Sequence, residues 1–179
     1  MTEFKIVAAG DGKTDKIPLL MVLKGDAFPD RYVPTVFENY HQDFSVDGTN
    51  YTLHFWDTAG QDEYDRLRPL SYSGANVVLL CFDFDSKDTF THLSSWMKEI
   101  EKYAKGAKII LVGLKMNLRE PGNPDHVTDE EVNQFVEKNS IFCFCPCSCK
   151  TGEGIDAIVP AIVKACTQKK KGFFSFFKK

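Results

Sequence analysis

The fold is decided by the stretch FKIVAAGDGKTDKIPLL, residues Phe4 to Leu20. The apolar run from Phe4 to Ala9 predicts a buried strand, and after a glycine-containing turn we expect a helix from about Lys16 to Leu23. Strand, glycine turn and helix in this order form a phosphate-binding loop, because backbone N–H groups and the helix dipole then point at an anion. The stretch therefore predicts an α/β domain with a phosphate site at one end of its sheet.

Three positions of this loop depart from the usual pattern, which is a glycine, four residues, then Gly-Lys-Ser/Thr. Counted from Gly10, the chain has Asp15, Lys16 and Ile17 at the last three positions, followed by Pro18. Asp15 places a side chain and a negative charge where glycine lets the backbone approach a phosphate. Ile17 lacks the hydroxyl that binds Mg²⁺, and Pro18 lacks a backbone N–H. The scaffold of the loop is kept, but much of its chemistry is lost.

A second register of the loop uses the tripeptide Gly12-Lys13-Thr14. It would need its first glycine at Val7, inside the predicted strand, and we reject it. The candidate phosphate-binding residues are therefore Gly10, Asp11, Gly12, Lys13, Thr14, Asp15, Lys16, Ile17 and Pro18.

Length and composition fit one soluble globular domain, with 179 residues, 43% hydrophobic and 26% charged. The sequence shows no secretory signal and no apolar run long enough to cross a bilayer, so we expect a cytoplasmic protein. The net charge is −3, but the last eleven residues contain five lysines and no acid, so the rest of the chain is clearly acidic. This distribution argues against a nucleic-acid surface and predicts a domain at residues 1–168 with a basic tail at 169–179.

The six cysteines suggest free thiols in a reducing compartment. Four of them alternate along the chain, at Cys143, Cys145, Cys147 and Cys149. A soft-metal or redox site is one explanation, and a strand with small buried residues on one face is the other. We favour the strand, because a straight strand cannot close four thiolates around one ion.

The remaining sequence alternates between strand and helix patterns. Asp47-Gly48-Thr49-Asn50 is a hairpin signal, and Thr128 with Glu131 forms a capping box at the start of a helix. This alternation predicts a mostly parallel six-stranded sheet with one antiparallel hairpin and helices on both faces. Besides the first strand and helix, we expect strands at residues 40–46, 51–56, 77–84, 108–113 and 141–147, and helices at 89–103, 128–138 and 155–167.

Three further stretches are specific enough to indicate a family. They are GDAFPDRYVPTVFENY (Gly25 to Tyr40), WDTAGQDEYDRLRPLSY (Trp56 to Tyr72) and CSCKTGEGI (Cys147 to Ile155). With them the chain resembles a Rho/Rac-type small GTPase of the Ras superfamily over about Phe4 to Thr167. The resemblance implies a Ras-like P-loop fold, GTP or GDP and Mg²⁺ as ligands, two nucleotide-sensing switch segments, and signalling to the actin cytoskeleton.

The resemblance also assigns roles to individual residues. Phe28 would pack on the base. Thr35 would bind Mg²⁺ directly, and Asp57 would bind it through a water. Gly60 would donate to the γ-phosphate, and Gln61 would orient the attacking water as the catalytic residue. The partner-binding surface would contain the exposed apolar and aromatic residues of the two switch segments, Phe37, Tyr40, Trp56, Tyr64, Leu67 and Leu70.

The motifs that would read the guanine base are also altered. The family has Asn or Thr, Lys, any residue, then Asp after its fifth strand, whereas this chain has Leu114, Lys115, Met116 and Asn117. An amide at position 117 offers one acceptor and one donor where a carboxylate would accept twice. The second base-binding motif is matched by Ser148, Cys149 and Lys150, with Cys149 where alanine is usual.

Two other family features are missing. The helical insert expected after Arg119 is replaced by a short loop from Glu120 to His126, and the chain ends in FFSFFKK instead of a prenylation box. Either the sequence stops before its natural end or membrane attachment works differently. We expect the tail to bind an anionic membrane, at the inner face of the plasma membrane, through Lys169, Lys170, Lys171, Phe173, Phe174, Phe176, Phe177, Lys178 and Lys179.

The altered residues cluster at the nucleotide, while both switch sequences match the family. The leading hypothesis is therefore a monomeric Rho-like signalling module, impaired in nucleotide and Mg²⁺ binding, that acts by binding effectors and regulators. The alternative is a working switch that hydrolyses GTP with Gln61.

Overall fold

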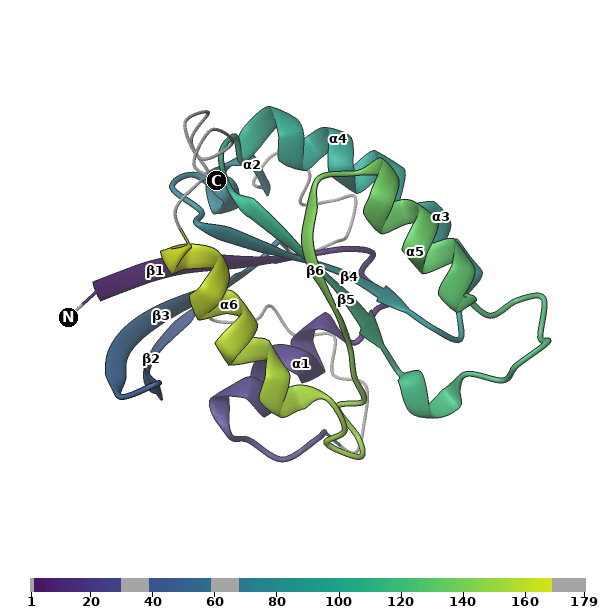
Figure 1. The fold of residues 1–179 in the computed structure, drawn as a ribbon, viewed down its shortest axis with the longest axis horizontal. Helices are drawn as coiled ribbons and strands as arrows, with labels where there is room; N and C mark the ends of the chain where they lie inside the picture. Colours follow the sequence, from purple (N-terminus) through teal and green to yellow (C-terminus); the bar gives the residue numbers. More distant parts are fainter. Residues whose placement is uncertain (1, 30–38, 59–67, 169–179) are drawn as a thin grey trace, which may run out of the picture.

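The structure, a computed structural model, describes residues 2–29, 39–58 and 68–168 (Figure 1). Within these ranges six strands form one sheet in the order β2-β3-β1-β4-β5-β6. All neighbouring strands are parallel except β2 and β3, which pair antiparallel. The predicted mixed sheet is confirmed.

The strands lie close to their predicted positions, whereas the short helix at Arg68–Tyr72 was not expected from the sequence. The strands are β1 (Thr2–Ala9), β2 (Tyr40–Val46), β3 (Thr49–Asp57), β4 (Val77–Asp83), β5 (Lys108–Leu114) and β6 (Ile141–Pro146). The helices are α1 (Lys16–Lys24), α2 (Arg68–Tyr72), α3 (Lys87–Thr91), α4 (Leu93–Tyr103), α5 (Asp129–Lys138) and α6 (Ile158–Thr167), with short 3-10 helices η2 (Met116–Leu118) and η3 (Ile155–Ala157).

The helix expected over residues 89–103 is wrong as a single element, because the chain forms α3 and α4 with a break at His92. The side chain of His92 leaves the helix to pair with Asp11 of the phosphate loop. The predicted last helix begins with the 3-10 turn η3 and becomes α-helical only at Ile158.

Helices cover both faces of the sheet, as Figure 1 shows: α1 and α6 pack on one face, and α3, α4 and α5 on the other. The strands alternate accordingly, since Ile6 and Ala8 of β1 join the α1/α6 side of the core while Val7 and Ala9 join the opposite side. Every residue of β4 is buried, as expected for a central parallel strand.

Gly10 fixes how the phosphate loop leaves β1. Its φ is +136°, and a Cβ built there would lie 2.5 Å from the carbonyl oxygen of Cys81 in β4. Only glycine combines this backbone conformation with such a close approach. The loop therefore runs directly across the carboxyl end of β4.

Two other sequence predictions are resolved by the fold. The hairpin turns over Asp47 and Gly48 alone, both with positive φ, because Val46 already pairs with Thr49. Residues 119–128, all of them described, form turns, so no insert helix lies between η2 and α5.

The six cysteines are free and all belong to, or pack against, the core on the α1/α6 side. Cys143 and Cys145 pack on the same side of β6, as the strand explanation predicted, whereas Cys147 and Cys149 lie beyond the end of this strand. Among the described residues, no group of three or more histidine, cysteine or acidic side chains is arranged to hold a metal ion. None of the helices in the described ranges has the length and apolar character needed to span a membrane.

Candidate nucleotide-binding site

The phosphate loop lies at the carboxyl ends of the parallel strands, between β1 and α1. Asp57 at the end of β3 pairs with Ala8 of β1, which brings this acid next to the loop. Residues after β5 and β6 reach the same edge, because the N–H of Met116 donates to the carbonyl of Cys147 at 3.1 Å. The described candidates from four segments are thus collected at one edge of the sheet, the edge at which ligands bind in such folds.

Lys16 and Asp57 form a buried ion pair in the site. Their side chains are only 3% and 5% exposed, with Lys16 Nζ lying 3.7 Å from Asp57 Oδ1. Asp57 Oδ1 is buried and has no hydrogen-bond partner within the described residues. The contact is long for a hydrogen bond, so attraction between the two charges is its main component.

Asp83, which sequence reasoning missed, lies at the centre of the site. Its Oδ1 accepts a hydrogen bond from the N–H of Asp15 at 3.3 Å, and its Oδ2 lies 3.1 Å from Lys115 Nζ. Lys115 Nζ is also 4.0 Å from Asp15. Lys115 thus forms ion pairs with two carboxylates, those of Asp83 and Asp15. One sequence signal could have revealed Asp83: it is an acid directly after the apolar run Val77 to Phe82. It therefore stands at the carboxyl end of a buried strand, where ligands bind in such sheets.

The charges of this cluster perturb one another. Burial raises the pKa of Asp83 to about 6, although Lys115 opposes the shift. Burial also raises the pKa of Asp15. Burial by itself would lower the pKa of Lys115, but the charges of Asp83 and Asp15 outweigh it and raise that pKa. Lys115 is therefore a firmly charged cation between two acids.

Asp11 ties the loop to the helices on the opposite face of the sheet, a role the sequence did not reveal. Its Oδ1 accepts from the indole N–H of Trp96 at 2.9 Å, and its Oδ2 pairs with His92. This hydrogen bond is the main reason that the pKa of His92 is raised. Both partners come from the segment around the break between α3 and α4.

The predicted base-binding residues also contact one another. The hydroxyl of Ser148 donates to Asn117 Oδ1 at 2.9 Å, so the one acceptor of the Asn117 side chain is engaged. Leu114 is completely buried and Cys149 nearly so, whereas Lys150 is exposed. Phe28 packs against the core on the α1/α6 side.

Comparison with known proteins identifies the family. The model of the Ras family matches residues 5–168. The chain belongs to the Ras family, as a Rho-type small GTPase. It is 41% identical over 177 residues to a protein of Candida albicans named GTP-binding protein RHO1, covering 93% of this chain and 89% of that protein. Its α/β fold is the Ras-like one that the resemblance implied.

Membership of the Ras family implies GTP or GDP and Mg²⁺ as ligands, and the site can be tested for them. Mg²⁺ prefers several oxygen ligands in near-octahedral geometry. Among the described residues Asp57 offers a carboxylate, but Ile17 has no oxygen to add and Lys16 already neutralises Asp57. The described donors therefore do not fit the ion well. Thr35, Gly60 and Gln61 lie outside the described residues.

The partner surface expected of a Rho-type protein is described only in part. Leu70 on α2 is 70% exposed. Tyr40 and Trp56 are half-buried: the Tyr40 hydroxyl donates to the Leu20 carbonyl at 2.7 Å, and Lys5 lies over the Trp56 ring at 4.0 Å. The remaining predicted partner residues lie outside the described ranges, namely Phe37, Tyr64 and Leu67.

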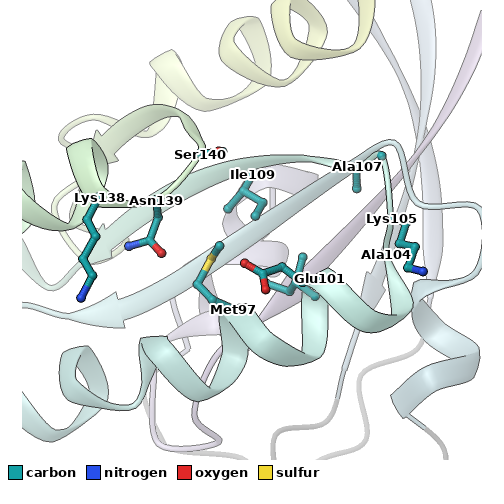
Figure 2. A pocket seen from close by; sticks show the side chains of 11 residues that line it. Met97, Glu101, Ala104, Lys105, Ala107, Ile109, Lys138, Asn139 and Ser140 are labelled. Carbon is teal, nitrogen blue, oxygen red and sulfur yellow. The ribbon is translucent and has the colours of Figure 1, made fainter.

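A hollow of about 410 Å³ lies away from the loop, between the end of α4 and the turns that precede β5 and β6 (Figure 2). Met97 and Glu101 of α4 and Lys138 and Asn139 at the end of α5 line it. Because these turns lead into the amino ends of their strands, the hollow is at the opposite end of the sheet from the nucleotide site.

Proposed function

We propose that this Rho-type protein binds guanine nucleotide and Mg²⁺ weakly and acts by binding effectors and regulators through its switch segments. One observation carries the proposal: the main departures within the family's sequence motifs lie at the nucleotide edge, while both switch sequences match the family. These departures are Asp15, Ile17, Pro18, Leu114 and Asn117.

Contacts within the site support this view. Asn117 engages Ser148, the N–H of Asp15 engages Asp83, and Lys16 pairs with Asp57. A nucleotide must compete for each of these groups. Losing three or four charge-assisted contacts at ~1.5–3 kcal/mol each costs roughly 5–10 kcal/mol, or about three to seven powers of ten in affinity. Non-additivity can halve that loss, and the weakening remains large.

The second candidate is a working GTP switch with Gln61 as the water-orienting residue. The structure offers one observation in its favour. Lys16 is held as the first residue of α1, and its ion pair with Asp57 spans a loose 3.7 Å that a phosphate oxygen can displace.

The deciding experiment measures guanine nucleotide. We expect protein purified under native conditions to release little nucleotide on denaturation, and calorimetry to show weak GDP binding that EDTA hardly changes. Tight binding that EDTA abolishes would favour the working switch. The combined variant Asp15→Gly, Ile17→Thr, Leu114→Asn and Asn117→Asp should recover affinity. Replacing Pro18 as well is the next step if recovery is partial.

The proposal includes where the protein acts. Residues 1–168 form the signalling domain, which works as a monomer, and the basic, Phe-rich tail at 169–179 holds it at an anionic membrane surface. We propose that the protein signals to the actin cytoskeleton, and membership of the Rho-type family supports this.

A further inference from the structure

Asp83 is held in a fixed position by both its backbone and its carboxylate. Its backbone N–H donates to the hydroxyl of Thr89 at 2.9 Å, and its side chain is 2% exposed. Its carboxylate reaches Lys115 at 3.1 Å on one side and the N–H of Asp15 on the other. Such an arrangement, with backbone anchor, cation and amide donor, holds the anion in place.

The amide that Asp83 engages is one that the fold offers to a phosphate. Asp15 is the residue immediately before α1, a helix of nine residues, so its N–H points out of the helix start. In a phosphate loop such N–H groups cradle the anion, with help from the helix dipole. In this protein the Asp15 N–H instead donates to the Asp83 carboxylate, which carries a negative charge as a phosphate does.

Lys115 is engaged in the same way. Lys115 has a left-handed backbone conformation with φ of +58°, which is unusual for a residue other than glycine. Its ammonium group forms ion pairs with Asp83 and Asp15. This contact also explains how Asp15 is tolerated at a glycine position, since Lys115 partly neutralises it. Breaking the Asp83 contacts would release both a cation and an amide donor at the nucleotide edge.

We infer that Asp83 is a built-in carboxylate ligand of the phosphate loop and that it disfavours the binding of a nucleoside diphosphate or triphosphate there. The inference rests on the proposed weak nucleotide binding and extends it, because Asp83 is not among the five departures on which that proposal was built. A polyphosphate must displace the carboxylate from the Asp15 N–H and then bind beside a buried acid of the same charge sign.

The test compares Asp83→Ser with wild type and with Asp85→Ser in calorimetric titrations of GDP. Asp85 is a fitting control because it also raises the pKa of Asp15 by its charge, whereas the Asp83 carboxylate is the one in contact with the loop. We expect GDP to bind Asp83→Ser about 10–100-fold more tightly than wild type, and Asp85→Ser to change affinity little. An equal gain in both variants would overturn the inference, since general charge removal would then explain it.

The remaining outcomes separate the inference from the proposed function. Tight GDP binding by wild type would refute the proposed function, whereas weak binding by wild type and an unchanged Asp83→Ser variant would refute the inference alone. If Asp83→Ser does not fold, Asp83→Asn takes its place. A second readout is the NMR shift of the Asp15 amide proton, which should show a titration step near pH 6 in wild type that is missing in Asp83→Asn. A shift that titrates equally in both proteins counts against the contact.

Discussion

At the scale of single residues, Asp83 makes the stability of the protein depend on pH. Its pKa is raised to about 6 by burial, so the folded chain holds a proton more tightly than the unfolded chain. This stabilisation is present below the ordinary Asp pKa of about 4 and is lost as the pH rises through 6. We expect the free energy of unfolding attributable to Asp83 to fall by up to about 3 kcal/mol over this window.

The measurement is urea unfolding at several pH values between 4 and 7. Asp83→Asn should flatten the slope, because the amide does not titrate, whereas Asp156→Asn, at an exposed acid of η3, should keep the wild-type slope. The titratable groups that interact with Asp83 are Lys115, Asp15, Cys81 and Cys149. An Asp83→Asn slope equal to that of wild type would show that another group is responsible.

Cys143 should be the most reactive thiol among the half-buried cysteines. A hydrogen bond from the Cys145 thiol stabilises its thiolate and lowers the pKa of Cys143 to about 7. Cys166 is the matched control, because it is also half-buried but burial raises its pKa to about 12. Iodoacetamide at pH 7.5 followed by mass spectrometry should modify Cys143 at least about tenfold faster. Equal rates at the two sites would contradict this, and Cys145→Ala should slow the modification of Cys143.

At the scale of elements, apolar periodicity predicted each strand and most helices. The spacing of apolar residues in the sequence directly reflects which face of a strand or helix is buried. Periodicity failed at the break between α3 and α4. The apolar stripe of Phe90, Leu93 and Trp96 continues the helical spacing across His92, whereas the break accompanies a contact between His92 and Asp11. Periodicity carries no information about a partner 81 positions away.

Two helix starts allow a direct test of capping. Thr128 accepts a hydrogen bond from the N–H of Glu131 at 3.2 Å, which confirms the Thr128 half of the predicted capping box. The Glu131 side chain instead contacts the hydroxyl of Thr128. Ser86 before α3 makes no side-chain cap bond. Thr128→Ala should therefore lower the free energy of unfolding by about 1 kcal/mol and Ser86→Ala by much less. Urea unfolding of both variants checks this difference. Equal losses would mean that the Thr128 bond contributes nothing to stability.

At the scale of the whole molecule, the sequence predicted which edge of the sheet holds the candidate site but not how its polar groups pair. The glycine turn and the family motifs placed Lys16, Asp57 and Asn117 there. The contacts of Asp83 with Asp15 and of Asn117 with Ser148 join residues 68 and 31 positions apart. Their geometry depends on strand register and on loop paths, which no local pattern specifies.

The last prediction concerns how the whole chain meets a membrane. The tail KKKGFFSFFKK, residues Lys169 to Lys179, combines five lysines with four phenylalanines. Each lysine gains about 1 kcal/mol near an anionic leaflet, and the phenylalanine rings add affinity by inserting at the interface. The full chain should therefore sediment with vesicles containing phosphatidylserine, and a chain ending at Gln168 should not.

Two matched variants separate charge from insertion. Replacing the four tail phenylalanines by serine keeps every lysine, so binding that remains should disappear at high salt. Replacing the five lysines by glutamine keeps the rings, and binding should then depend little on salt. Equal sedimentation of the full chain and of the chain ending at Gln168 would refute the membrane role, because the tail is the only part that differs between them.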